Sequence, residues 1–179
     1  LGDVYKRQVD IGVSRDSTDG HMILTGTDAA DSITIVGDVG IEVPGTDGAD
    51  ILTGGAGDDD IEGAAGNDTI AGGAGSDTLD GGADDAILSG DAGSDTIDGG
   101  DGTDIAKFAG KQAEYTFASS SDGKTITVTH VATSDADTVT HVETLRLDGG
   151  DDIVGERASS VGLRLKRERG GYERLGIVG

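Results

Sequence analysis

Residues 45–107 read GTDGADILT, GGAGDDDIE, GAAGNDTIA, GGAGSDTLD, GGADDAILS, GDAGSDTID and GGDGTDIAK, which is one nine-residue unit written seven times with small changes. In the eighth place of the unit, leucine or isoleucine recurs at intervals of nine from Leu52 to Ile97. In the sixth place, aspartate recurs from Asp50 to Asp104, with one gap at Ala86. Repetition with so short a period predicts an architecture in which each unit packs against its neighbours.

Each unit divides into a turn and a short strand. The last residues of a unit, such as DTIA or DTLD, alternate polar and apolar side chains, which is typical of a very short strand with one inward face. The first residues are rich in glycine, which adopts turn conformations closed to other residues and leaves carbonyl oxygens free to converge. The repetition therefore predicts an all-β coil with two units per turn, in which unit n stacks on unit n+2 at ~4.8 Å.

The charges of this stretch predict a bound cation. Between Gly45 and Ala106 there are sixteen Asp or Glu and no Lys or Arg. Two aspartates one rung apart repel each other by roughly 3 to 4 kcal/mol at an effective dielectric of about 20. Because the stretch has no cation of its own, the charge must be relieved from outside. A hard divalent ion with six to eight oxygen ligands fits this supply of carboxylates and carbonyls, and calcium fits better than magnesium.

The units GGAGDDDIE and GGAGSDTLD also match the pattern GGxGxDxUx, in which U is a large apolar residue. On this motif the chain resembles the RTX, or hemolysin-type, calcium-binding repeat proteins. The resemblance implies a parallel β-roll, a right-handed β-solenoid, that binds calcium in its turns. It also implies a protein secreted by a Gram-negative bacterium through type I secretion. The alternative is a disordered linker rich in glycine and aspartate, but the apolar residues keep phase with the aspartates, which favours the folded coil.

The resemblance further implies that each calcium lies between units n and n+2 and takes an aspartate carboxylate and glycine-position carbonyls from both. Three pairs of sixth-place aspartates are complete in this sense: Asp50 with Asp68, Asp59 with Asp77, and Asp77 with Asp95. About three complete sites are therefore expected, and up to five. The ligand residues that the family scheme predicts are Gly45, Gly48, Asp50, Gly54, Gly55, Gly57, Asp59, Gly63, Gly66, Asp68, Gly72, Gly73, Gly75, Asp77, Gly90, Gly93, Asp95, Gly99, Gly102 and Asp104.

The fifth unit departs from the pattern. Ala86 stands in the place of the expected aspartate, and Asp84 stands in the place of the fourth glycine. Calcium is therefore expected to bind weakly or not at all through this unit, unless Asp84 or Asp85 turns inward. Four further acids fall outside the ligand places and are interpreted as solvated surface charge: Asp58, Asp60, Asp80 and Asp98.

The composition of the whole chain excludes several classes of partner. It holds 35 acids against 13 bases, for a net charge of −22, which argues against nucleic acid and anionic membranes. The sequence has no run of eighteen apolar residues, so no membrane span is predicted. The sequence has no cysteine, so disulfides are excluded. Bound metal is then the remaining means of stabilising a fold with few large apolar side chains. We expect the module to be monomeric.

The segments before the repeats are interpreted separately. Residues 1–8 contain Asp3-Val4-Tyr5-Lys6-Arg7-Gln8, which looks like a translated sequencing adapter. We interpret them as a scar, with a basic N-terminal arm as the alternative, and a scar implies that the natural protein began further upstream. Residues 9–44 are expected to form irregular strands that cap the coil, with a degenerate unit at Gly26–Ile33 and entry into the regular coil at Pro44.

The segments after the repeats are also distinct. Residues 108–155 combine aromatic residues with strand patterns at 124–129 and 138–147 and a hairpin turn at Ser120–Gly123. This segment resembles the β-rich region that often follows RTX repeats, and it predicts a cap over the open end of the coil. Residues 156–179 carry six bases and three acids. We interpret them as a disordered or non-native tail, with contact to an anionic surface as the alternative.

A search for catalytic motifs finds no HExxH and no GxSxG in this sequence, so the chain is not predicted to be an enzyme. The function that we expect is a calcium-binding module of a secreted protein, which folds on meeting extracellular calcium and so supports type I secretion and stability. Two alternatives stay open. The chain belongs either to a secreted RTX hydrolase, a serralysin-type metalloprotease or a lipase, or to a surface-layer or adhesion protein.

Overall fold

The computed structural model describes residues 12–15, 22–25, 30, 32–34, 40–121, 123–148, 151–154, 164–167 and 171–174. The described elements are β1 (Gly12–Arg15), β2 (Met22–Thr25), β3 (Ser32–Thr34), β4 (Ile41–Thr46), β5 (Ile51–Gly55), β6 (Asp60–Ala64), β7 (Thr69–Ala74), β8 (Thr78–Asp80), β9 (Ile87–Ala92), β10 (Thr96–Asp98), β11 (Ile105–Phe108), the 3-10 helix η1 (Gln112–Glu114), β12 (Tyr115–Ser119), β13 (Thr125–His130), β14 (Ala136–Thr140), β15 (Thr144–Leu147), β16 (Asp151–Val154), β17 (Arg164–Arg167) and β18 (Gly171–Arg174).

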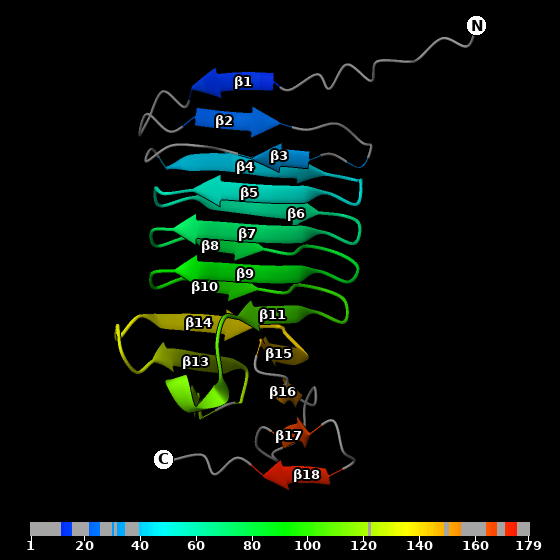
Figure 1. Cartoon of the computed structure of the whole chain (residues 1–179). Coiled ribbons are helices and arrows are strands. Elements are labelled where there is room, and N and C mark those ends of the chain that lie inside the picture. Colours follow the sequence, from blue (N-terminus) through cyan, green and yellow to red (C-terminus); the bar gives the residue numbers. More distant parts are fainter. Residues whose placement is uncertain are drawn as a thin grey trace, which may run out of the picture.

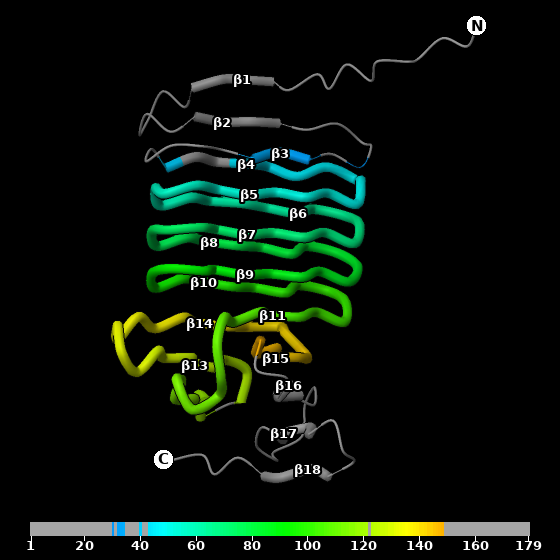
Figure 2. Tube along the Cα trace, viewed as in Figure 1, coloured from blue at the N-terminus to red at the C-terminus, as the bar shows by residue number. Residues whose placement is uncertain are grey.

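The strands form two nine-stranded sheets, between which the chain alternates as it coils. One sheet has the order β1-β2-β4-β6-β8-β10-β14-β13-β12, and the other has the order β18-β17-β16-β15-β11-β9-β7-β5-β3. Figure 1 shows the result as a stack of flattened coils with turns along both edges. Figure 2 follows this path from β5 to β11 along one continuous trace. The predicted all-β parallel roll with extra strands at its C-terminal side is confirmed.

Two repeat units form one coil, so paired residues in neighbouring strands are eighteen residues apart in sequence. Leu79 pairs with Ile61 on one side and with Ile97 on the other, each eighteen residues away. In the second sheet, Ile70 pairs in the same way with Leu52 and Leu88. The sheets are parallel here because every strand runs in the same direction as the strand one coil earlier.

The core is a double column of apolar side chains between the two sheets. Each strand of the repeats alternates exposed and buried residues, and its eighth-place Leu or Ile is almost fully buried. Each such side chain contributes about 1.5 to 3 kcal/mol by leaving water. The buried apolar residues form one cluster: Ile33, Val43, Leu52, Ile61, Ile70, Leu79, Ala86, Leu88, Ile97, Ala106, Phe108, Val128, Val139, Leu145 and Leu147.

Before the repeats, parallel pairing already begins in the part of residues 9–44 that the structure describes. Ile33 in β3 pairs with Leu52 and is buried, so it adds one layer to the core. β4 pairs in parallel with β6 and places Pro44 opposite Glu62 inside the sheet. The interpretation of residues 1–8 as a scar lies outside the described residues, as does most of the degenerate unit at Gly26–Ile33.

After β11 the chain leaves the coil, forms η1 and the antiparallel hairpin β12–β13, and then returns to the end of the coil. β14 pairs in parallel with β10, and β15 pairs in parallel with β11. The strand pattern predicted over residues 138–147 corresponds to two strands, β14 and β15. The chain bends at residues 141–143, which form a turn because β14 and β15 belong to different sheets.

Beyond β15, the strands β16, β17 and β18 continue one sheet in antiparallel order. β17 and β18 fall within residues 156–179, the segment interpreted as a disordered or non-native tail. The rest of that segment lies outside the described residues, so this interpretation stays a prediction. No helix in the described part of the chain is long and apolar enough to cross a membrane.

Candidate metal centre in the turns

The sixth-place aspartates begin the strands and are buried. Their exposed fractions lie between 0% and 3%, which is unusual for a carboxylate. They are buried because each one lies two residues before the inward residue of its strand, a Leu or Ile in five cases and Ala106 after Asp104, so the period-two alternation turns the aspartate inward. The buried set is Asp50, Asp59, Asp68, Asp77, Asp95 and Asp104.

Hydrogen bonds join these aspartates into two ladders, one along each edge of the roll. On one edge, the N–H of Asp59 donates to Oδ1 of Asp77 at 2.8 Å, and the N–H of Asp77 donates to Oδ1 of Asp95 at 2.9 Å. On the other edge, the N–H of Asp50 donates to Oδ1 of Asp68 at 2.8 Å. Asp59, Asp77 and Asp95 therefore lie in a row along one edge, as the repeat predicts.

The second carboxylate oxygen gives the observation that bears on metal binding. Oδ2 of Asp68, of Asp77 and of Asp95 is buried and has no hydrogen-bond partner among the described residues. A buried charged oxygen without a partner is strongly destabilising. Each of these atoms is satisfied either by a proton or by a cation, so the residues present fit a bound metal ion.

Glycines hold the space around these oxygens open. A Cβ atom placed on Gly72 would collide with Oδ2 of Asp77, and one placed on Gly90 would collide with Oδ2 of Asp95. The fourth-place Gly75 and Gly93 have φ values of 140° and 136°, in the region that favours glycine. A larger residue at these places of the turn would therefore displace the carboxylate or strain the backbone.

In the metal-free chain, the pKa values of the buried ladder carboxyls Asp68, Asp77 and Asp95 are raised, chiefly by burial. Burial raises the pKa of Asp77 to about 6, and the charges of Asp95 and Asp59 add to this, although the N–H bond from Asp59 opposes it. The pKa of Asp68 is likewise raised to about 6, chiefly by burial. Burial also raises the pKa of Asp95. These ladders therefore favour any partner that carries positive charge.

The fifth unit interrupts the second ladder. Ala86 is buried in the place of a carboxylate, and its N–H donates to Oδ1 of Asp104 at 2.8 Å. Asp84 and Asp85 are both exposed, and Oδ1 of Asp85 accepts the N–H of Thr103 at 2.9 Å. Neither aspartate turns inward, so this rung has no carboxylate of its own.

Two acids in the C-terminal segment continue the ladders and were not predicted as site residues. Oδ1 of Asp137 accepts the N–H of Asp95 at 2.9 Å, and Oε2 of Glu143 accepts the N–H of Asp104 at 2.8 Å. The signal for them was present in the sequence. Asp137-Thr138-Val139 repeats the pattern of Asp95-Thr96-Ile97, and Glu143-Thr144-Leu145 is a longer-armed version of it.

Of the four acids interpreted as solvated surface charge, three are exposed and Asp98 is not. Asp58, Asp60 and Asp80 are exposed, and the half-buried Asp98 contacts Nδ1 of His141 at 2.7 Å. Among the residues that the structure describes, no three His, Cys, Asp or Glu side chains gather into a metal-binding group.

Comparison with known proteins gives a repeat family and a likeness to solved structures. The profile of the RTX calcium-binding nonapeptide repeat (4 copies) matches residues 44–79 and 80–106. No curated protein matches the chain. Among solved structures, the chain is similar to the extracellular lipase LipA from Serratia marcescens, with a TM-score of 0.42 and 19% sequence identity. The likeness covers 80% of this chain and 20% of the lipase chain, so this chain spans about a fifth of that protein.

Proposed function

Because residues 44–79 and 80–106 of this chain are RTX calcium-binding nonapeptide repeats, we propose that the roll is a calcium-dependent folding module of a secreted protein. The observation that carries the proposal is the row of Asp59, Asp77 and Asp95, whose carboxylates stack one coil apart inside the protein. Calcium is the hard, oxygen-seeking cation that such a row accepts.

The ligands are proposed as the sequence predicts them. Carboxylates come from the pairs Asp50 and Asp68, Asp59 and Asp77, and Asp77 and Asp95, and carbonyls come from the glycine positions of the turns on either side. About three complete sites result. The pairings that run through Ala86 are proposed to bind weakly or not at all, since that rung lacks a carboxylate.

We propose that folding depends on the metal, because residues 45–106 have no Lys or Arg to offset the negative charge of the buried aspartates. Most rungs bury one Leu or Ile together with one carboxylate; the rung of Ala86 lacks the carboxylate, and the rung of Asp104 buries Ala106 instead. Binding free energy then becomes folding free energy. Extracellular modules bind calcium at about 10⁻⁴ to 10⁻³ M, so a chain that stays unfolded inside the cell folds on release.

The remaining parts of the proposal follow the family. The route is type I secretion, the destination is the outside or the surface of a Gram-negative bacterium, and the module acts as a monomer. Residues 108–155 act as a cap. Their strands β12 to β16 pair with the end of both sheets, where unpaired edges would otherwise invite association.

Calcium titration of the purified full chain tests the proposal. Circular dichroism is recorded in chelator and then at increasing calcium, with magnesium at the same concentrations as the control. The expected result is a gain of strand signal near millimolar calcium that magnesium does not reproduce. A strand signal that is already complete in chelator would refute the calcium-dependent fold.

A further inference from the structure

The geometry points to a calcium site beyond the nonapeptide repeats, formed where Asp137 of the returning C-terminal segment meets Asp95. This site lies 42 residues past the last aspartate of its ladder and outside the residues that the repeat profile matches. The inference rests on the proposed function, because it extends the same ladder by one rung.

The returning strand β14 reproduces the backbone of a repeat. Thr138 and Val139 pair with Thr96 and Ile97, as Thr96 and Ile97 pair with the unit one coil earlier. The N–H of Thr138 donates to the carbonyl oxygen of Asp95 at 2.8 Å, and the N–H of Thr96 donates to that of Asp77 at the same distance. Val139 is buried and continues the apolar column. β14 is therefore a further rung of the roll.

Asp137 occupies the ligand place of this rung. It accepts the N–H of Asp95 at 2.9 Å, which is the distance at which Asp95 accepts the N–H of Asp77. Asp137 is only 9% exposed. Oδ2 of the neighbouring Asp95 is buried and has no hydrogen-bond partner among the described residues. The end of the ladder thus presents two adjacent carboxylates and one unsatisfied oxygen.

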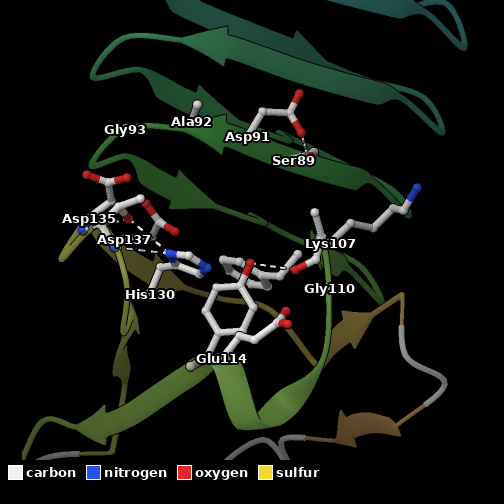
Figure 3. A pocket seen from close by; sticks show the side chains of 14 residues that line it. Ser89, Asp91, Ala92, Gly93, Lys107, Gly110, Glu114, His130, Asp135 and Asp137 are labelled. Carbon is white, nitrogen blue, oxygen red and sulfur yellow. Dashed lines mark hydrogen bonds between the residues drawn. The ribbon is translucent and has the colours of Figure 1, made fainter.

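A pocket of about 330 Å³ opens beside Asp137 and gives an ion access to it. Figure 3 shows Asp135 and Asp137 on the side of the pocket where Gly93 follows the end of β9. Gly93 belongs to the same unit as Asp95 and also lines the pocket, and the carbonyls of this turn are the ligands that we propose on this side of the site. The remaining ligands are then water, for which the pocket has room.

The bases of the pocket do not neutralise this charge. Lys107 lines the pocket but forms no ion pair within the described part of the chain, and Nδ1 of His130 contacts Oγ1 of Thr133 at 3.0 Å. Against them stand four acids on the same lining: Asp91, Glu114, Asp135 and Asp137. The balance of charge favours a cation.

The opposite edge is built differently, and we assign no site to Glu143. Glu143 also continues a ladder, through the N–H of Asp104. However, only residues 141–143 join β14 to β15, whereas residues 99–104 join β10 to β11. The shorter turn lacks the residues whose carbonyls are proposed as ligands in a repeat. Glu143 therefore accepts the hydrogen bond that a repeat aspartate would accept, but we propose no metal site beside it.

Asp137→Asn in the full chain tests the site, because the amide keeps an oxygen for the N–H of Asp95 and removes the charge. Bound calcium is counted by equilibrium dialysis. The expected result is one calcium fewer than in the unaltered chain. The control is Asp148→Asn, which removes an exposed carboxylate from the same segment and is expected to change nothing. An unchanged count in Asp137→Asn would overturn the site.

A second measurement does not depend on the folding of that variant. Tyr115 lines the same pocket, so terbium bound in place of calcium near Asp137 is expected to emit when tyrosine is excited. Tyr115→Phe should remove most of this emission, and emission equal to that of the unaltered chain would contradict the site. If the unaltered chain binds no calcium at all, the proposed function fails. If it binds calcium and only these two results are negative, this inference alone fails.

Discussion

Asp77 donates its main-chain N–H to Oδ1 of Asp95, one coil later, while its own Oδ1 accepts the N–H of Asp59 one coil earlier. Each aspartate is therefore both a donor and an acceptor in a vertical chain. This contact orients the carboxylate and leaves Oδ2 of Asp77 buried without a partner among the described residues. The same bond that fixes the coil thus prepares an oxygen for a cation.

Asp77→Asn is expected to weaken calcium binding more than any change outside the ladders, because Asp77 belongs to two of the complete pairs. Loss of a charge-assisted contact removes about 1.5 to 3 kcal/mol, which corresponds to a rise of about 10- to 100-fold in the calcium needed for folding. Calcium titration followed by circular dichroism measures this. The matched control is Asp80→Asn, an exposed aspartate three residues away; equal effects of the two changes would contradict the ladder as the binding site.

Ala86→Asp is expected to complete the interrupted ladder. The first-place Gly81 lies against the methyl group of Ala86, as Gly72 lies against the carboxylate of Asp77, so the backbone is already arranged for a carboxylate. The variant should bind one or two more calcium ions by equilibrium dialysis, and it should be less stable than the unaltered chain in chelator. An unchanged calcium count would show that Asp84, at the fourth place, prevents binding by itself.

Much of this architecture is predictable from the period alone. The phase of Leu52, Ile61, Ile70 and Leu79 requires one buried side chain per unit, and it also requires the aspartates two residues before them to share the inward face. Two units per coil then follow, because consecutive units alternate between sheets. The row of Asp59, Asp77 and Asp95 is a consequence of this phase.

The end of the roll was harder to predict because the period is broken there. The hairpin β12–β13 separates Asp137 from Asp95 by 42 residues, so a search at intervals of nine does not reach it. The run from Thr138 to Leu147 contains no Gly or Pro to mark the bend at residues 141–143. Only the pairing of β14 and β15 with different sheets shows that this run is two strands of one further coil.

Leu52→Ala and Ile51→Ala are adjacent changes that separate core packing from strand propensity. Leu52 is 1% exposed and lies between Ile33 and Ile70 in the column, whereas Ile51 is 52% exposed. We expect Leu52→Ala to lower the free energy of unfolding by about 2 to 5 kcal/mol, and Ile51→Ala to lower it by less than about 1 kcal/mol. Urea unfolding at saturating calcium measures both. A larger loss for Ile51→Ala would mean that the register is wrong.

Acidification is expected to act in opposite directions on the metal-free and the calcium-loaded roll. Burial raises the pKa of Asp68, of Asp77 and of Asp137 to about 6 in the folded, metal-free chain, against an ordinary value of 3.8. The folded chain therefore binds more protons than the unfolded chain between about pH 6 and pH 4. In chelator, the free energy of unfolding therefore rises as pH falls through 6. This gain is fully present below about pH 4, the pKa of the unfolded carboxyls, and it is lost again as pH rises through 6.

Calcium reverses this dependence because its ligands must be deprotonated, so protons compete with it below about pH 6. The measurement is circular dichroism at pH 5 and pH 7.5, in chelator and in excess calcium. In chelator the strand signal should be larger at pH 5, and in calcium the resistance to urea should be larger at pH 7.5. Asp77→Asn removes one of the groups whose pKa burial raises and should reduce the pH dependence in chelator. If the metal-free chain instead lost strand signal when the pH was lowered from 7.5 to 5, burial would not raise the pKa of the ladder carboxyls in the folded state.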